Sequence, residues 1–230
     1  MVHQVLHRFG FQFSSPQPTP LSTSHLLSAP LSDESAEPSG PYPELPGSLR
    51  GSRTSGMGLV LGGWGPVVLT GHADASWVDD SATQWSSHGY TFSISSCSVS
   101  WRSTCSSSIL SSSCEADIYA GAMAAQELRW LTYLLIDLGE QPHSPPLLYV
   151  DNKAMIALCQ EHKLEHGTKH IALRYLLARD LQQCGQLCLV YVATWANTAD
   201  VFTKALPPGV HQRFSNVLGL VLTLPHLLTA

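Results

Sequence analysis

The chain has 230 residues, of which 44% are hydrophobic and only 13% are charged. This length accommodates one domain of ordinary size plus an appendage, and the hydrophobic fraction suffices for a core. The formal net charge of −5 excludes binding to nucleic acid through overall charge, so any such binding requires a local basic patch. The six cysteines have no CxxC spacing, which argues against zinc and favours reduced thiols in an intracellular protein.

The two ends of the chain differ in composition from its middle. Residues 1–47 are rich in Ser and Pro and lack apolar periodicity, so we expect them to be disordered. The N-terminus has no long apolar stretch, so a signal peptide is not supported. The Leu-rich run 217–230 is interrupted by Pro225 and His226 and is too short to span a bilayer. We interpret it as the edge of a core or an exposed tail, and we expect no membrane partner.

Strands are predicted first along the chain. Apolar residues at 57–61 and 67–70 flank a Gly-rich turn, which predicts a hairpin that leads to Asp74. Residues 90–94 and 98–101 alternate between apolar and small polar side chains. This period of two predicts two half-buried antiparallel strands.

From Cys114 the apolar period changes to three and four residues, which predicts an amphipathic helix that ends near Gly139. The apolar run 147–150 follows a Pro pair and predicts a buried strand. Asp151 then stands at the carboxyl end of this strand, where open α/β sheets place ligands.

The remaining elements are two helices, a strand and a short last helix, expected at 152–160, 168–183, 187–192 and from about Asn197. The order βββ-α-β-α(α)-β-α predicts an α/β fold with a mixed sheet and helices on its faces. Right-handed crossovers place the first and fourth strands side by side. We therefore expect Asp74 and Asp151 at the same edge of the sheet.

Four aspartates have comparable places, at strand ends and helix starts: Asp74, Asp117, Asp151 and Asp200. Each alone reads equally well as a helix cap or a solvated residue, and Asp151 or Asn152 suits the cap of the following helix. Grouped in a partly buried site, however, the four carboxylates require a cation. Oxygen ligands select Mg²⁺, or Mn²⁺ as the alternative, over zinc. Two such ions about 4 Å apart activate a water and stabilise the leaving oxygen of a phosphodiester.

Five short motifs occur in order along the chain: GHADASW at 71–77, SSSCEADIYA at 111–120, VDNKA at 150–154, TKHI at 168–171 and ADVFTK at 199–204. They resemble the series G-Y-S-D-A-D-W, S-S-T-E-A-E-Y-x-A, D-N-x-A, T-K-H-I and A-D-x-x-T-K of the RNase H domain at the end of copia-type retrotransposon Pol polyproteins. The resemblance implies an RNase H-like fold, with a five-stranded mixed sheet and helices on both faces, over residues 67–206. A connection-like segment at 48–66 precedes this domain and a tail at 207–230 follows it.

The resemblance also implies a metal-dependent ribonuclease that cuts the RNA strand of RNA–DNA hybrids, with Mg²⁺ or Mn²⁺ as cofactor and a reverse transcriptase domain as partner. No Y-x-D-D motif is present, so we expect no polymerase activity from this chain. Carried over by position, the catalytic and metal-binding acids are Asp74, Asp117, Asp151 and Asp200. The nucleic-acid contacts are Arg102, Asn152, Lys169, His170 and Lys204.

Some positions depart from the family pattern. Asp117 stands where the family has Glu, which sets the carboxylate back by roughly 1 Å, a misplacement that costs about a hundredfold in rate. Thr104 and Cys105 replace a basic pair, and Gly167 replaces a common Arg, so phosphate contacts are lost. Two main hypotheses follow: an active hybrid-cleaving ribonuclease, and a catalytically impaired retroelement remnant that keeps the fold and binds nucleic acid weakly. A spurious gene product without function is the third.

Overall fold

The computed structural model describes residues 57–60, 66–78, 84–106, 109–140, 142, 144–160 and 172–222. Contacts between residues divide the chain into a larger unit, residues 61–204, and a smaller one that comprises residues 1–60 and 205–230. The predicted disorder of residues 1–47 and the predicted contacts Lys169 and His170 lie outside the described residues.

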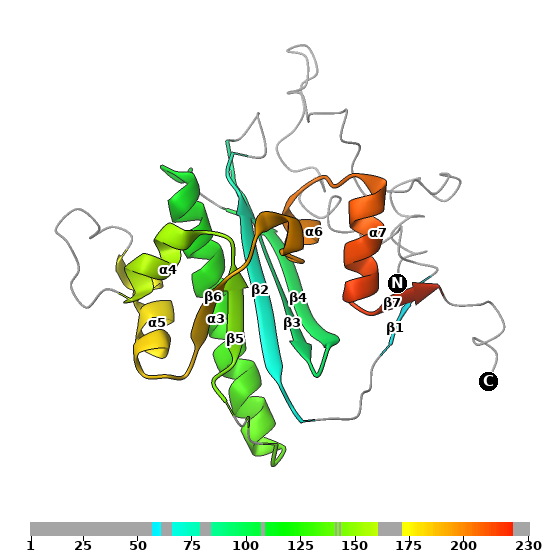
Figure 1. Ribbon diagram of the computed structural model, residues 1–230. Helices are drawn as coiled ribbons and strands as arrows, with labels where there is room; N and C mark the ends of the chain where they lie inside the picture. The colour runs from blue at the N-terminus through cyan, green and yellow to red at the C-terminus, as the bar shows by residue number, and fades with distance from the viewer. Residues whose placement is uncertain are drawn as a thin grey trace, which may run out of the picture. The chain divides into compact units, whose positions relative to one another are not determined.

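The larger unit is built on a five-stranded sheet in the order β4-β3-β2-β5-β6 (Figure 1). β2 pairs with β3 antiparallel and with β5 parallel, so the sheet is mixed, as predicted. This pairing also confirms that the strand carrying Asp74 lies beside the strand that precedes Asp151. The strands are β2 (Leu69–Ser76), β3 (Ser87–Ile94), β4 (Cys97–Cys105), β5 (Leu147–Val150) and β6 (Cys188–Tyr191).

β3 and β4 form the predicted pair of antiparallel strands, and each is longer than predicted. The turn between them consists of Ser95 and Ser96, with φ of 50° and 70°. A two-residue hairpin turn of type I′, whose twist matches that of the strands, has positive φ at both positions. The turn is therefore of the tight kind, although it contains no glycine.

The predicted hairpin between residues 57–61 and 67–70 is wrong. β1 (Met57–Leu59) pairs antiparallel with β7 (Leu220–Leu222) in the smaller unit. The physical reason is that both edges of β2 are already paired, with β3 and β5, so β2 has no free edge for β1. The smaller unit also contains α7 (Pro208–Val217), within the residues 207–230 that we expected to form a tail.

The long predicted helix is α3 (Ser113–Asp137). The Ser112 side chain accepts a hydrogen bond from the Glu115 N–H at 3.2 Å, and Glu115 Oε2 accepts one from the Ser111 N–H at 2.7 Å. This is close to a capping box and explains the helix start. Gly139, with φ of 83°, follows the helix end, where a left-handed residue is common.

The later helices follow the prediction with one change of boundary. α4 (Lys153–Gln160) and α5 (Ala172–Gln183) lie within the predicted ranges and pack beside α3 (Figure 1). The short last helix starts at Asp200, as α6 (Asp200–Thr203), after a 3-10 turn η2 (Thr194–Ala196).

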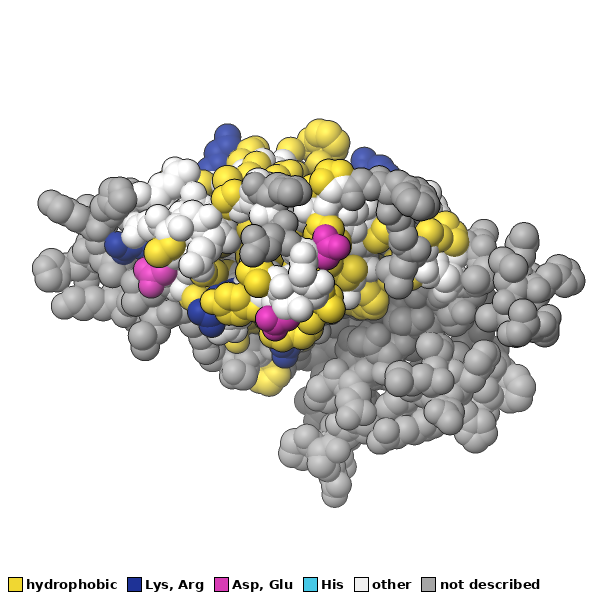
Figure 2. Space-filling view, turned by 90° about the horizontal axis from the view of Figure 1, so that it is seen from below, with side chains coloured by type: hydrophobic (Ala, Val, Ile, Leu, Met, Phe, Trp, Pro, Cys, Tyr) yellow, Lys and Arg dark blue, Asp and Glu magenta, His cyan; other side chains and the backbone are white. Residues whose placement is uncertain are grey.

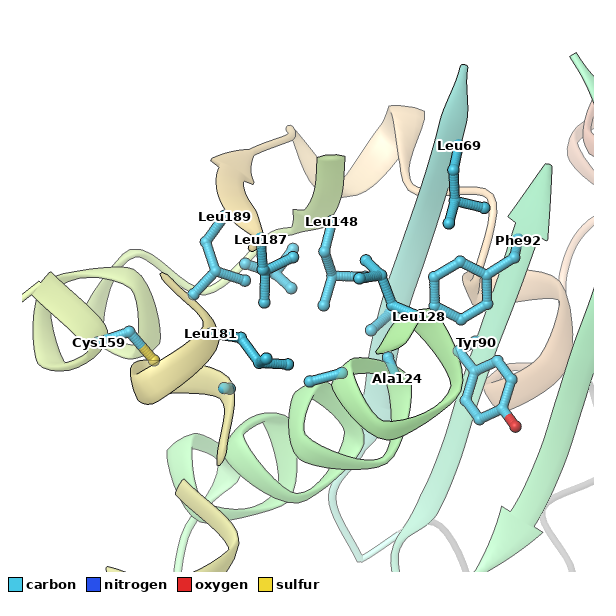
Figure 3. Packing of buried hydrophobic residues seen from close by; sticks show 14 of the residues in the cluster. Leu69, Tyr90, Phe92, Ala124, Leu128, Leu148, Cys159, Leu181, Leu187 and Leu189 are labelled. Carbon is cyan, nitrogen blue, oxygen red and sulfur yellow. The ribbon is translucent and has the colours of Figure 1, made fainter. Parts of the chain in front are cut away.

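Helices cover both faces of the sheet. On one face, Phe92 and Leu148 point toward Leu128 of α3 in the hydrophobic core (Figure 3). α6 lies against the other face of the sheet. Asp74 of β2 and Gly89 of β3 are paired and therefore share a face. On that face a Cβ added to Gly89 would lie 2.9 Å from Thr203 Cγ2 of α6. The close approach of α6 therefore requires a glycine at this point of β3.

Candidate active site

Three acidic side chains from three elements meet at the carboxyl ends of β2 and β5. Asp74 lies near the end of β2, Asp117 in the second turn of α3 and Asp151 directly after β5. One oxygen from each carboxylate lies within 4.8 Å of the other two. Asp74 is 2% exposed and the other two are partly buried. Three of the four predicted acids therefore form one cluster.

The parallel pairing of β2 with β5 explains the meeting of Asp74 and Asp151, because parallel strands end at the same edge of a sheet. Asp117 is held at this edge by the Ala75 N–H and by Asn152, whose Nδ2 donates to Asp117 Oδ2 at 2.7 Å. Asn152 Oδ1 in turn accepts a hydrogen bond from the Met155 N–H at 3.0 Å, as an N-cap of α4 does. Asn152, a predicted nucleic-acid contact, thus caps the helix and orients Asp117.

The fourth predicted acid, Asp200, is linked to Asp74 of the cluster by Lys204. Lys204 Nζ lies 3.0 Å from Asp74 Oδ1 and 2.9 Å from Asp200 Oδ1. Thr203 Oγ1 donates to the second oxygen of Asp74. Lys204, predicted to contact phosphate, therefore faces two carboxylates, which are almost completely buried.

Burial disfavours the charged forms of these acids. It raises the pKa of Asp74 to about 7, against the opposing effect of Lys204. It also raises the pKa of Asp117 to about 6 and that of Asp200 above its usual range. Burial lowers the pKa of Lys204, but the two carboxylates raise it more, so the net shift is upward. Carboxyl groups in this state take up a proton or a cation, and a set of carboxylate oxygens fits a hard divalent metal.

Three positioning residues were missed by the sequence analysis. Thr194 Oγ1 donates to Asp151 Oδ2 at 2.9 Å, and the buried Asn197 Nδ2 donates to the Ala73 carbonyl at 3.0 Å. Thr203 lies inside the last motif, but no sequence pattern indicated that its hydroxyl would donate to Asp74. The partners of Thr194 and Asn197 are 43 and 124 residues away, so no local pattern indicated them.

Arg102 is exposed on β4, the edge strand, and its side chain hydrogen-bonds the Tyr90 hydroxyl. Tyr90 pairs with Ala73 on one side and with Arg102 on the other. At about 4.8 Å per strand, Arg102 starts about 10 Å from Ala73, next to the acids. Because Arg102 pairs with Tyr90, its side chain lies on the α3 face of the sheet, whereas Asp74 lies on the face covered by α6.

The opposite end of the larger unit has a different character. An open cavity of about 450 Å³ lies between the second half of α3, the segment before β5 and the end of α5, and none of the described residues that line it is acidic. Hydrophobic side chains predominate in the view from this end (Figure 2). Those exposed on the last turns of α3 are Trp130, Tyr133, Leu134 and Ile136. The two ion pairs of Lys204, with Asp74 and Asp200, lie instead at the edge that carries Asp74 and Asp151.

The six cysteines are all free of disulfides. None of the helices in the described part of the chain combines the length and the apolar character needed to cross a membrane.

Curated proteins similar to this chain include transposon polyproteins. The chain is 33% identical over 168 residues to the "Retrovirus-related Pol polyprotein from transposon RE2" of Arabidopsis thaliana and 31% identical over 172 residues to that from transposon TNT 1-94 of Nicotiana tabacum. The matches cover 73% and 75% of this chain but 12% and 13% of the relatives, so the chain spans about an eighth of their length. No protein-family model matches the chain.

Similar solved structures include the N-terminal RNase H domain of a Mycobacterium tuberculosis protein, with 13% identity, a TM-score of 0.43 and coverage of 65% of this chain and 97% of that one. The LC11 RNase H1 in complex with an RNA/DNA hybrid has 11% identity, a TM-score of 0.44 and coverage of 59% and 93%. The motifs in register, the identity with the polyproteins and the mixed five-stranded sheet lead to one conclusion. This chain belongs to the Pol polyproteins of copia-type retrotransposons, and its larger unit has the fold of their RNase H domain.

Proposed function

We propose that this chain hydrolyses the RNA strand of RNA–DNA hybrids, with Mg²⁺ as its preferred ion, held by Asp74, Asp117, Asp151 and Asp200. The observation that carries the proposal is the meeting of three carboxylates, from β2, α3 and the end of β5, within 4.8 Å. Three partly buried anions this close repel one another unless a cation joins them. A site of this composition is costly as a purely structural feature and suits a divalent metal.

Bound divalent ions supply a Lewis acid for the phosphodiester and a water acidic enough to attack it. The side chains of the chain hold and orient the carboxylates for this task. Asn152 and the Ala75 N–H orient Asp117, and Thr194 orients Asp151. Such partners of metal-binding side chains restrict their rotation and keep the ligand oxygens directed at the ion.

The shorter side chain of Asp117 does not prevent assembly of the cluster. Although the family has Glu at this position, the Asp117 carboxylate lies within 4.8 Å of Asp74 and Asp151. This distance keeps the Asp117 carboxylate within reach of an ion shared with Asp74 and Asp151, and the proposal of an active ribonuclease builds on it.

The hybrid is contacted, in this proposal, by Arg102 on the edge strand and by Lys169 and His170. With a net charge of −5 the chain has no general attraction for polyanions, so these local contacts carry the affinity. We further propose that a reverse transcriptase domain acts as the partner that supplies the hybrid, as the resemblance implies.

The test uses the full chain and a hybrid with a labelled RNA strand, with Mg²⁺ or Mn²⁺ and with chelator. We expect cleavage of the RNA strand in the hybrid and none in single-stranded RNA. Asp151→Asn should lower the rate at least about a hundredfold, as expected for the loss of a group that positions reacting atoms. Asp137→Asn, at an exposed position at the end of α3, is the matched control and should cleave normally.

Equal cleavage by Asp151→Asn, or cleavage in chelator, would refute the proposal. The variant Asp117→Glu separates the two hypotheses. If Asp117→Glu cleaves and the natural chain does not, the chain is an impaired enzyme. If neither cleaves hybrid with either ion, it is a remnant that retains the fold.

A further inference from the structure

The acidic site consists of two halves that share Asp74. In the first half, oxygens of Asp74, Asp117 and Asp151 lie within 4.8 Å of one another. In the second half, Lys204 Nζ lies between Asp74 Oδ1 and Asp200 Oδ1, at 3.0 and 2.9 Å. One half is thus a set of carboxylates suited to a metal, and the other already contains a cation.

The position of Lys204 follows from the end of α6. Its N–H donates to the Asp200 carbonyl at 2.9 Å, so its backbone is held to the helix, and its side chain forms an i, i+4 ion pair with Asp200. The side chains of Asp74 and Asp200 are 1% and 8% exposed, whereas that of Lys204 is 30% exposed. The ammonium therefore covers the two carboxylates from the solvent side.

We propose that Lys204 is a built-in counter-ion that occupies the position of a second metal ion. The chain then binds one divalent ion on Asp74, Asp117 and Asp151, and it binds a second only when the ammonium leaves Asp74 and Asp200. This inference rests on the proposed function, because it assumes that the first half holds a metal.

The argument is one of space and charge. An ammonium and a divalent ion cannot both lie between the same two carboxylate oxygens, since each needs direct contact with them and like charges repel. Lys204 is attached by a flexible stem and is partly exposed, so it can turn to solvent at the cost of two ion pairs. The second ion is therefore bound more weakly than the first.

Mn²⁺ titration of the chelator-treated full chain by calorimetry measures both sites directly. The natural chain should bind one ion tightly and a second one weakly. An opposite charge within about 4 to 6 Å changes the proton affinity of a carboxylate roughly ten- to a thousandfold. On this scale Lys204→Met should bind the second ion about tenfold more tightly or better.

Three further variants identify the cause of that gain. Arg129→Met removes the same charge from an exposed position on α3 and should leave both affinities unchanged. Lys204→Arg keeps the cation and should behave as the natural chain. Adding Asp200→Asn to Lys204→Met should abolish the gain, because Asp200 is the ligand that only the second half uses.

A labelling experiment on the natural chain covers the case in which Lys204→Met does not fold. Acetylation with an amine-reactive ester, mapped by mass spectrometry, should modify Lys204 slowly without metal and faster at Mn²⁺ concentrations that fill the second site. Lys153, which is exposed, is the internal reference and should react at a constant rate.

The outcomes are distinguishable. Two equally tight ions in the natural chain, no gain in Lys204→Met, or unchanged Lys204 labelling at saturating Mn²⁺ would overturn the inference and leave the proposed function intact. Absence of any Mn²⁺ binding in the natural chain and in Lys204→Met would overturn both.

Discussion

Asp74 should make the metal-free protein less stable as the pH rises. Burial raises the pKa of Asp74 from 3.8 to about 7, so between these values the folded state holds a proton that the unfolded chain has released. A group with a raised folded pKa contributes stability that is fully present below its unfolded pKa and is lost as the pH rises through the folded pKa. The window of this loss is therefore about pH 4 to pH 7.

The shift of Asp74 is about three pKa units, which at 1.36 kcal/mol per unit corresponds to a loss on the order of 4 kcal/mol. His72 acts in the opposite direction. Burial lowers its pKa from 6.5 to about 4, so its contribution to stability increases with pH across that interval, by on the order of 3 kcal/mol. The pH dependence of the natural chain's free energy of unfolding therefore does not report the contribution of Asp74 alone.

The difference between the natural chain and Asp74→Asn isolates the effect, because His72 and the other groups that do not act on Asp74 contribute equally to both proteins. Urea unfolding in chelator at pH 4, 5, 6, 7 and 8 gives the free energy of unfolding of both proteins. We expect the natural chain to lose on the order of 4 kcal/mol relative to Asp74→Asn over this range. A difference independent of pH would refute the raised pKa. A relative gain would mean that Lys204 keeps Asp74 ionised in the folded state.

Asn152→Ala should lower the free energy of unfolding by about 2 kcal/mol and weaken Mn²⁺ binding, because it removes both the cap of α4 and a hydrogen-bond donor to Asp117. Unchanged urea unfolding would contradict these roles. Gly71→Ala should cost about 1–3 kcal/mol, since a Cβ there would lie 2.2 Å from Phe92 Cε1, whereas Gly209→Ala, with open space around it, should be close to neutral in the same assay. Burial raises the pKa of Cys159 to about 12. Native protein at pH 8 should therefore react with a thiol reagent at the exposed Cys105 and Cys184 but not at Cys159. Mass spectrometry that detects modified Cys159 would show the prediction to be wrong.

Local patterns were sufficient for much of the sheet and for the long helix. The three- and four-residue period from Cys114 predicted α3, because a helix places residues at that spacing on one buried face. The alternation at 90–94 and 98–101 predicted β3 and β4 for the equivalent reason. The expected adjacency of Asp74 and Asp151 needed one more rule, the right-handed crossover, and the pairing of β2 with β5 agrees with it.

Tertiary contacts decided what no local pattern encodes. Apolar periodicity indicates which face of a strand is buried but not which strand lies beside it, so the pairing of β1 with β7 was missed. Lys204 is the clearest case. Its ion pair with Asp200 is readable as an i, i+4 spacing, but its contact with Asp74 joins residues 130 positions apart and exists only once α6 packs against the sheet. Whether this lysine faces phosphate or carboxylate is therefore a property of the fold.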